Sequence, residues 1–268
     1  MDTSLQKQII DYFENQRFLG DTLFIENFNA DVYVDDSQNE AVQAEIENGG
    51  TVKTNNKSTK KHKEEKPEST IELLDTNWQS AKSLDVLYDR IHSCQQCSLG
   101  KTRTNLVFGT GAPNADIMVI GEAPGKDEDE QGEPFVGRAG KLLTKIIESI
   151  DLKREDVYIA NICKCRPPSN RAPLQDEVAA CMPFLLRQIE IIKPAFILAF
   201  GATAVGSLTG TKPVMAQARG KLTDFHGVQM LITYHPAALL YNPNLKRAVW
   251  DDMKLLRRLY DEYLAKKK

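Results

Sequence analysis

The feature that most constrains the fold is an alternation, from residue 80 onward, of short apolar runs with helical patterns. Four runs are typical of strands, namely ADIMVIG (115–121), VYIANIC (157–163), AFILAFG (195–201) and VQMLITY (228–234). Helical periodicity separates or flanks them, as in SLDVLYDRIHSC, AGKLLTKIIESI, PLQDEVAACMPFLLRQIEII, ATAVGSL and NLKRAVWDDMKLLRRLYDEYL. Buried strands that alternate with helices form parallel sheets. The sequence therefore predicts an α/β fold with a central, mainly parallel four-stranded sheet that has helices on both faces.

The first 79 residues lack the composition of a compact fold. No aromatic residue occurs between Tyr33 and Trp78, and all five cysteines and eleven of the twelve prolines lie beyond that stretch or at its end. A segment this polar buries too little apolar surface to offset its ordering entropy. The spacing of Leu5, Ile9 and Phe13 leaves open a short amphipathic helix that docks a partner. We expect a weakly ordered segment at 1–35, a disordered charged linker at 36–79 and one folded domain at 80–268.

Charge is divided unevenly between these parts. The formal net charge of −3 argues by itself against a nucleic-acid-binding protein. Residues 1–79, however, carry 8 Lys and Arg against 16 Asp and Glu, or −8, whereas residues 80–268 carry 26 against 21, or +5. The predicted domain is therefore basic, and the acidity belongs to the extension.

The cysteine count and the hydropathy indicate the cellular compartment. No run approaches the roughly 18 apolar residues of a membrane span, and MDTSLQKQIIDYFENQRF lacks the profile of a signal peptide. Five cysteines are too few for a disulfide scaffold. We expect a cytoplasmic protein without a membrane partner, in which clustered thiols bind metal or react rather than pair.

The spacing of the cysteines predicts a metal centre. Cys94 and Cys97 form a CxxC at the end of the first predicted helix, Cys165 follows a strand, and Cys181 lies within a helix. Four thiolates can hold either a structural zinc ion or an iron–sulfur cluster. Cys163 would share a strand face with Cys165 and could replace it as a ligand. Unrelated buried cysteines are the alternative.

Three loops that follow predicted strands carry the residues best suited to a binding site. The glycine-rich stretch GEAPGKDEDEQGEPFVGRAG lies between a strand and a helix, where open α/β sheets bind ligands. Its glycines permit close backbone approach, and its acidic, Phe-bearing composition suits a base pocket better than a phosphate loop.

The other two loops are shorter. Asn161 ends the second predicted strand and can donate and accept toward a base edge. Lys164, Arg166 and Arg171 follow it and suit phosphates, although an ordinary solvated basic loop would look similar. His235 comes directly after the last predicted strand, where Pro236 favours an extended backbone. A structural histidine is the alternative there.

Together these motifs resemble the family 4 uracil-DNA glycosylases, the iron–sulfur branch of the uracil-DNA glycosylase superfamily. The resemblance rests on GEAPGKDEDEQGEPFVGRAGKLL, on NICKCRPPSNRAP followed by Cys181, and on YHPAALLYNP, and it extends from about Leu84 to residue 268. It implies a monomeric enzyme of base excision repair that flips uracil out of single- or double-stranded DNA and hydrolyses its N-glycosidic bond, leaving an abasic site. The implied fold is an α/β sandwich.

The resemblance also implies roles for individual residues. Asn161 would bind the pairing edge of uracil, and His235 would donate to uracil O2 as charge builds on the leaving base. Phe135 would stack on the base. Glu122 would shape the site of the attacking water, and Glu128 would lie beside uracil C5, where it disfavours the thymine methyl.

The resemblance assigns the remaining candidates to three groups. The backbone of Gly121, Ala123 and Gly125 would line the pocket. The basic residues beside the pocket, Arg138, Lys164, Arg166 and Arg171, would contact the DNA backbone. The implied cofactor is a [4Fe-4S] cluster held by Cys94, Cys97, Cys165 and Cys181, whereas Cys163 stays unassigned because family members commonly carry an apolar residue there.

Two other functions fit part of the pattern. One is a relative that traps uracil-DNA covalently through a histidine in a basic insert, but no His occurs between Cys163 and Cys181. The other is a non-catalytic iron–sulfur or zinc protein that binds damaged DNA. The intact set of Phe135, Asn161 and His235 argues against it.

Overall fold

The four predicted apolar runs form the parallel part of the sheet. The computed structural model describes residues 77–267. The four runs give strands β2 (Ile117–Gly121), β3 (Tyr158–Asn161), β4 (Phe196–Phe200) and β6 (Val228–Thr233). They pair in parallel in the order β3-β2-β4-β6. Every residue of β2, β3 and β4 is buried, as expected for strands covered on both faces. The predicted α/β class is therefore confirmed.

The sheet has six strands, so the predicted number of four is wrong. Strand β1 (Thr110–Gly111) pairs antiparallel with β3, and β5 (Leu222–Phe225) pairs antiparallel with β6. Both lie at edges of the sheet. Strand β1 is only two residues long, and three of the four β5 residues are exposed. Neither strand therefore has the apolar run that reveals a buried strand in a sequence.

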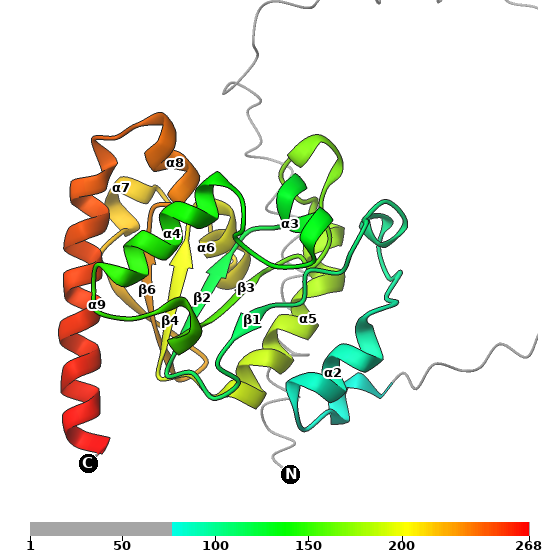
Figure 1. Ribbon diagram of the computed structural model, residues 1–268, viewed down its shortest axis with the longest axis horizontal. Helices are drawn as coiled ribbons and strands as arrows, with labels where there is room; N and C mark the ends of the chain where they lie inside the picture. The colour runs from blue at the N-terminus through cyan, green and yellow to red at the C-terminus, as the bar shows by residue number, and fades with distance from the viewer. Residues whose placement is uncertain (1–76, 268) are drawn as a thin grey trace, which may run out of the picture. The chain divides into compact units, whose positions relative to one another are not determined.

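Helices cover both faces of the sheet, as predicted. Figure 1 shows α4 (Arg138–Glu148) in front of the sheet and α5 (Gln175–Ile192) and α6 (Ala202–Thr209) behind it. The remaining α-helices are α2 (Leu84–Ile91), α3 (Lys126–Gln131), α7 (Met215–Ala218), α8 (Pro236–Tyr241) and α9 (Leu245–Lys267). Short 3₁₀ helices are η1 (Trp78–Ser80), η2 (Ser98–Lys101), η3 (Arg154–Asp156) and η4 (Pro168–Asn170).

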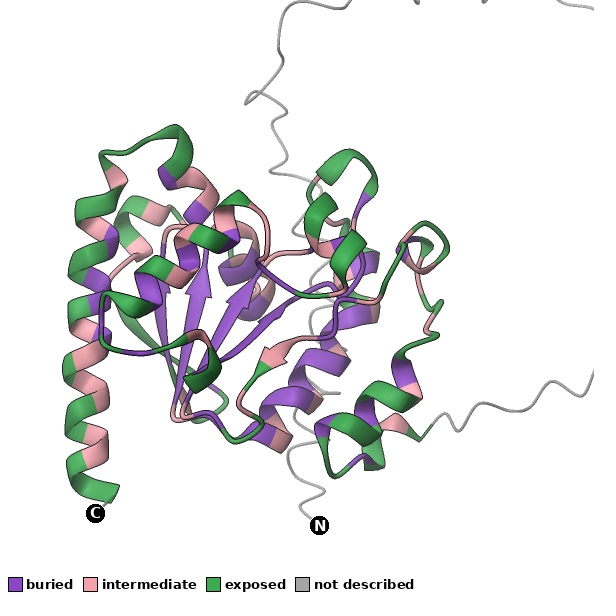
Figure 2. Ribbon diagram, in the orientation of Figure 1, coloured by how far each residue is buried: buried purple, intermediate pink, exposed green. Residues whose placement is uncertain are grey.

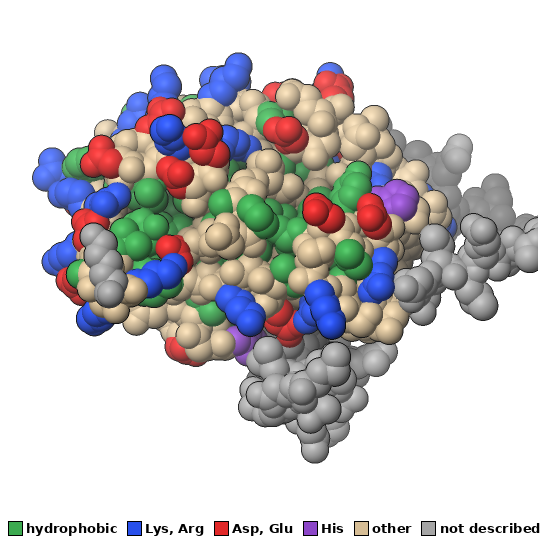
Figure 3. Space-filling model, turned by 60° about the horizontal axis from the view of Figure 1, so that its bottom comes forward, with side chains coloured by type: hydrophobic (Ala, Val, Ile, Leu, Met, Phe, Trp, Pro, Cys, Tyr) green, Lys and Arg blue, Asp and Glu red, His purple; other side chains and the backbone are tan. Residues whose placement is uncertain are grey.

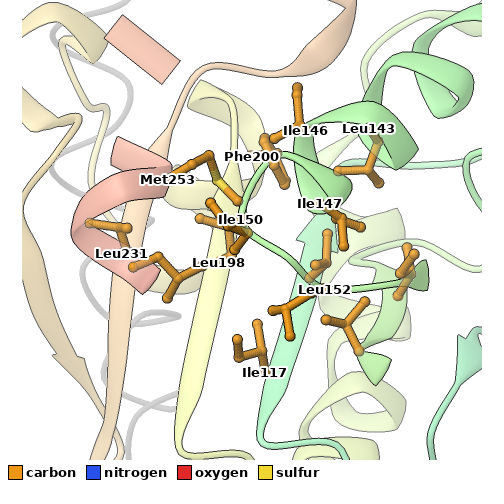
Figure 4. Packing of buried hydrophobic residues seen from close by; sticks show 14 of the residues in the cluster. Ile117, Leu143, Ile146, Ile147, Ile150, Leu152, Leu198, Phe200, Leu231 and Met253 are labelled. Carbon is orange, nitrogen blue, oxygen red and sulfur yellow. The ribbon is translucent and has the colours of Figure 1, made fainter. Parts of the chain in front are cut away.

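A large apolar cluster joins the sheet to α4, α8 and α9. Ile117 and Leu198 of the sheet share it with Leu143 and Ile147 of α4 and Met253 of α9 (Figure 4). Burial of one such side chain stabilises the fold by about 1.5–3 kcal/mol. Figure 2 shows the buried strands between helices whose outer surfaces are exposed. The loops at the ends of the strands are therefore attached to a rigid base.

The described part of the chain begins at residue 77, slightly before the predicted domain boundary at residue 80. Trp78 packs against Phe184 with ring centroids 4.9 Å apart, and Arg90 donates a hydrogen bond to the Asn77 carbonyl. These residues belong to the end of the expected linker at 36–79. The expectations for 1–35 and for the rest of the linker lie outside the described residues.

The predicted site residues lie where the parallel strands end. Figure 3 brings forward the opposite end, where the strands begin, and acidic and basic side chains are interspersed there. None of the helices within residues 77–267 is long and apolar enough to cross a membrane.

Candidate active site

The carboxyl ends of β2 and β3 bring three predicted site residues together. Gly121 is in register with Asn161, and the Ile162 N–H donates to the Gly121 carbonyl over 2.9 Å. A Cβ atom on Gly121 would lie 2.5 Å from Asn161 Oδ1 and 2.5 Å from Phe135 Cζ. Glycine is therefore required at 121, because the Phe135 ring and the Asn161 amide occupy the space that a side chain would need.

The end of β6 adds His235 to this group. The Gly201 N–H donates to the Thr233 carbonyl over 2.9 Å, and a Cβ on Gly201 would lie 3.0 Å from His235 Cβ. The rings of Phe135 and His235 have centroids 5.6 Å apart and an interplanar angle of 32°. Phe135, Asn161 and His235, which come from three separate segments of the chain, are therefore neighbours in the structure.

Asn161 presents an unused acceptor to this site. Its side chain is buried, with 2% of its surface exposed, and Oδ1 has no hydrogen-bond partner within residues 77–267. A buried unpaired acceptor costs about 1–3 kcal/mol. An acceptor left in this state suits a ligand that brings its own N–H donor.

His235 is held as a neutral donor. Its Nδ1 accepts a hydrogen bond from the Ala237 N–H over 3.2 Å, which fixes the tautomer with the proton on Nε2. Burial lowers the pKa of His235 to about 4, and the nearby Glu128 carboxylate opposes this shift only in part. At neutral pH the imidazole is therefore uncharged and offers one N–H.

Glu128 holds the glycine-rich loop closed. Its carboxylate accepts hydrogen bonds from the N–H groups of Gly125 (3.1 Å), Val136 (3.0 Å) and Gly137 (2.9 Å). These donors come from both sides of helix α3, which the sequence did not predict because KDEDEQ has no apolar periodicity. The Glu128 carboxylate therefore joins the two ends of the segment that leads to Phe135.

Phe135 has an uncommon backbone conformation. Its φ is 55°, a left-handed value that few residues other than glycine adopt. A Cβ on Gly140 would lie 1.8 Å from the Phe135 carbonyl oxygen, so α4 can begin beside this loop only with glycine at that position. Phe135 is buried, with 6% exposed. Such outliers occur where the surrounding structure holds a functional group in place.

The other predicted pocket residues lie beside these groups. Glu122 and Ala123 are partly buried and follow β2 directly, and the Cys163 N–H donates to the Glu122 carbonyl over 3.0 Å. Gly125 forms the N-cap of α3.

The four predicted contacts to the DNA backbone differ in exposure. Arg138 is exposed in the first turn of α4. Arg166 is partly buried and donates to Asn170 Oδ1 over 2.8 Å. Lys164 has no exposed surface, so the prediction that it contacts a phosphate is wrong. The reason is that its side chain turns inward to the Asn161 carbonyl and to Gln188, which is 24 residues away in the sequence.

Arg171 forms an ion pair with a buried carboxylate. Its guanidinium donates to both Glu177 oxygens, over 2.8 and 2.7 Å, and Ser98 Oγ donates to Glu177 Oε1 over 2.9 Å. Arg171 above all, together with the Leu174 N–H and Ser98, lowers the pKa of Glu177 to about 2. The group ties α5 to the loop after Cys97, and the Arg171 charge is largely paired within the protein.

The four predicted thiol ligands come from three segments. Cys94 and Cys97 lie after α2, Cys165 lies after β3, and Cys181 lies in α5. Burial first, and then the thiols of Cys181 and Cys97, raises the pKa of Cys94. Within the described residues, no group of three or more His, Cys, Asp and Glu side chains is arranged to hold a metal ion.

Hydrogen-bond donors point at the thiol sulfurs. Arg103 Nη1 donates to Cys165 Sγ over 3.1 Å, and the Lys164 N–H donates to Cys181 Sγ over 3.2 Å. Such donors stabilise a thiolate, the form of cysteine that ligates iron. The donor set therefore suits thiolate ligands, as an iron–sulfur cluster or a zinc ion requires. Strand β3 ends at Asn161, so the strand argument for Cys163 fails, and the neighbouring Cys181 thiol, together with burial, raises the pKa of this thiol.

Several supporting residues were missed from the sequence. Asp252 is buried in α9 and accepts hydrogen bonds from Thr233 Oγ1 (2.6 Å) and Arg219 Nε (2.9 Å), which anchors the strand end before His235. Its position between the buried Val249 and Leu256 was an available signal, because a charge within an apolar helical stripe usually has a buried partner. Arg103, Glu177 and Gly201 carry no comparable signal.

Comparisons with known proteins agree with this geometry. A family model described as the uracil DNA glycosylase superfamily matches residues 108–254. A type-4 uracil-DNA glycosylase of Saccharolobus solfataricus is 45% identical over 184 residues, which cover 65% of this chain and 85% of that protein. The type-4 uracil-DNA glycosylase of Archaeoglobus fulgidus is 44% identical over 186 residues, with 66% and 94% covered. That of Thermotoga maritima is 45% identical over 175 residues, with 64% and 91% covered.

Proposed function

Because the chain belongs to the uracil-DNA glycosylase superfamily, we propose that it removes uracil from DNA in base excision repair by hydrolysing the N-glycosidic bond. The observation that carries this proposal is the buried, unpartnered Asn161 Oδ1 beside Phe135 and the neutral His235. Uracil offers an N–H donor at N3, between carbonyl acceptors at O2 and O4.

Asn161 is suited to select uracil by its pairing edge. Oδ1 accepts from uracil N3–H while Nδ2 donates to O4. Cytosine presents an acceptor at N3 and an amino donor at C4, so both contacts would be repulsive. The base must first be flipped out of the duplex at a cost of a few kcal/mol, and stacking on Phe135 offsets about 1–3 kcal/mol of that cost.

His235 acts on the departing base. Cleavage of the bond between N1 and C1′ leaves the electron pair on uracil, and much of the negative charge develops on O2. The neutral His235 Nε2–H donates to that oxygen as the charge grows. A preorganised donor of this kind contributes about 10²–10³ in rate. Since the sugar becomes oxocarbenium-like, no covalent intermediate with the protein is needed.

The two glutamates complete the pocket. Glu122 accepts a hydrogen bond from the attacking water and orients it toward C1′. Glu128 lies beside uracil C5, where its carboxylate, held by three backbone N–H groups, leaves no room for the methyl of thymine. Arg138 and Arg166 contact the DNA phosphates, and Arg171 contributes less because Glu177 pairs its charge.

The four cysteines Cys94, Cys97, Cys165 and Cys181 hold a [4Fe-4S] cluster in this proposal. When bound, the cluster supplies a covalent tie between the loop after α2, the loop after β3 and helix α5. The glycosylase domain covers the predicted 80–268 with the few residues before it, and the protein acts as a monomer on single- or double-stranded DNA.

The proposal is tested with iron-loaded protein and a DNA oligonucleotide that contains one uracil. After incubation, hot alkali breaks the strand at any abasic site. We expect scission at the uracil and none in a matched oligonucleotide with thymine at that position. Absence of scission by the loaded protein, on both single- and double-stranded DNA, contradicts the proposal.

A further inference from the structure

Lys164 is a buried ammonium that the proposed reaction does not use. Its side chain has 0% exposure, and it lies between Cys163 and Cys165, three residues after Asn161. Nζ donates to the Asn161 carbonyl over 2.8 Å and to Gln188 Oε1 over 2.6 Å. Removing an ammonium from water costs several kcal/mol, so a buried lysine normally has a countercharge beside it.

No carboxylate supplies that countercharge. Within the described part of the chain, Nζ bonds only to the carbonyl of Asn161 and the amide oxygen of Gln188. Burial lowers the pKa of Lys164 to about 8, and the sulfurs of Cys181, Cys163 and Cys165 oppose this shift in part. Two of these are proposed ligands of the cluster, whose four thiolates make it negatively charged.

The partners of Lys164 are themselves fixed. Gln188 Nε2 donates to the Phe108 carbonyl over 3.0 Å and to Tyr158 Oη over 3.1 Å, which turns Oε1 toward the ammonium. The Lys164 N–H donates to Cys181 Sγ over 3.2 Å, and its carbonyl accepts from the Val107 N–H over 2.8 Å. The segment 161–164 therefore joins the proposed uracil site to the thiols. Hydrogen bonds fix it at the Asn161 carbonyl and at the Lys164 N–H.

We infer that Lys164 is a positioning residue that couples the cluster to the active site. The cluster thiolates supply its countercharge, and its ammonium holds the main chain of Asn161 where the side-chain amide meets uracil. This inference rests on the proposed function. It gives the cluster a second role besides its structural tie, because loss of the thiolate charge leaves the ammonium behind Asn161 uncompensated.

The inference predicts two effects of removing the charge. Misplacement of a substrate-binding group by about 1 Å can cost about 10²-fold in rate. Lys164→Met should therefore lower the single-turnover rate of uracil excision about 10- to 100-fold, with KM nearly unchanged. Because the potential of an iron–sulfur cluster depends on nearby charge, the reduction potential should also become more negative.

Arg187→Met is the matched control. Arg187 lies on the same helix, adjacent to Gln188, but its guanidinium donates to the Ala81 carbonyl and pairs with Glu190. This variant also replaces a partly buried cation by methionine, and it should change neither the excision rate nor the potential. Equal effects of both substitutions would mean that Lys164 only stabilises the fold and does not position Asn161.

The experiment uses the full chain loaded with iron. A Lys164→Met protein that loads iron but keeps the wild-type rate and potential overturns the inference. If the Lys164→Met protein does not bind iron, Gln188→Met tests the inference instead. This substitution removes one acceptor of the Lys164 ammonium and should lower the excision rate with KM unchanged. An unchanged rate then overturns the inference. Failure of the proposed function is seen separately, as absence of uracil excision by the wild-type protein.

Discussion

At the scale of the residue, His235 combines a fixed tautomer with a pKa well below the ordinary value. Its Nδ1 is engaged by the Ala237 N–H, and burial holds the pKa near 4. The unfolded value is about 6.5, so the unfolded chain takes up a proton first as the pH falls. The contribution of neutral His235 to stability is therefore complete above about pH 6.5 and is lost as the pH falls toward 4.

Nitrogen NMR checks the protonation state directly. Between pH 5.5 and 8 we expect His235 to remain neutral with its proton on Nε2, and to become charged only near pH 4. The spectrum of His235→Gln identifies the resonance by its disappearance. A titration midpoint near 6.5 would contradict the account of this site.

Substitutions of Asn161 and His235 test whether these side chains act in the reaction or in DNA binding. His235→Ala should lower turnover about 10²–10³-fold, because it removes a donor to developing charge. Asn161→Ala should lower turnover at least about tenfold and leave most of the DNA affinity, which phosphate contacts dominate. Fluorescence binding to uracil-DNA measures the second quantity. A parallel loss of affinity would mean that the two side chains hold structure.

Sequence patterns predicted some of these residues and missed others for physical reasons. Asn161 and His235 follow apolar runs, so parallel pairing alone places them at one edge of the sheet. Lys164 sits in a basic, proline-rich loop that is typical of solvent-exposed chain. Its burial depends on Gln188, which is 24 residues away, and no local pattern reports such a partner.

At the scale of the element, the Glu128 carboxylate links both ends of the segment between α3 and α4. Glu128→Gln should weaken all three contacts, because the amide nitrogen cannot accept from the Gly125 N–H and the neutral amide oxygen accepts from Val136 and Gly137 less strongly than a carboxylate does. Hydrogen bonds to charged groups contribute about 1.5–3 kcal/mol. We expect a lower melting temperature and slower excision, since Phe135 loses its support.

Glu130→Gln serves as the control for that loop. Glu130 lies on the same short helix but pairs with Lys126 at an exposed surface over 3.7 Å. Exposed pairs contribute about 0–1 kcal/mol, so stability and activity should hardly change. Comparable losses in the two variants would show that the Glu128 contacts to the backbone are unimportant.

The elements differ in how well they could be predicted. The four buried strands and five of the helices have clear apolar periodicity and were predicted close to their observed bounds. The edge strands β1 and β5 and the acidic helix α3 lack that periodicity. Pairing with a neighbouring strand forms β1 and β5, and capping contacts form α3, so no local sequence pattern reports them. The predicted strand end at Asn161 is confirmed, although the apolar run continues through Ile162 and Cys163.

At the scale of the whole molecule, the start of the domain is set by Trp78. A chain that begins at residue 80 loses the packing of Trp78 on Phe184, whereas one that begins at residue 77 keeps it. Calorimetry should find a melting temperature several degrees lower for the shorter chain. Both chains should excise uracil as the full chain does, because they contain every proposed site residue. Equal melting temperatures would contradict this boundary.

The central claim is that the domain hydrolyses the bond to uracil and then releases its products. The most direct measurement is the amount of free uracil liberated from excess uracil-DNA by iron-loaded protein, together with a denaturing gel of the same reaction. We predict several moles of uracil per mole of protein and no protein that remains attached to DNA. Absence of free uracil, or one equivalent at most with protein covalently held on the DNA, would contradict the account.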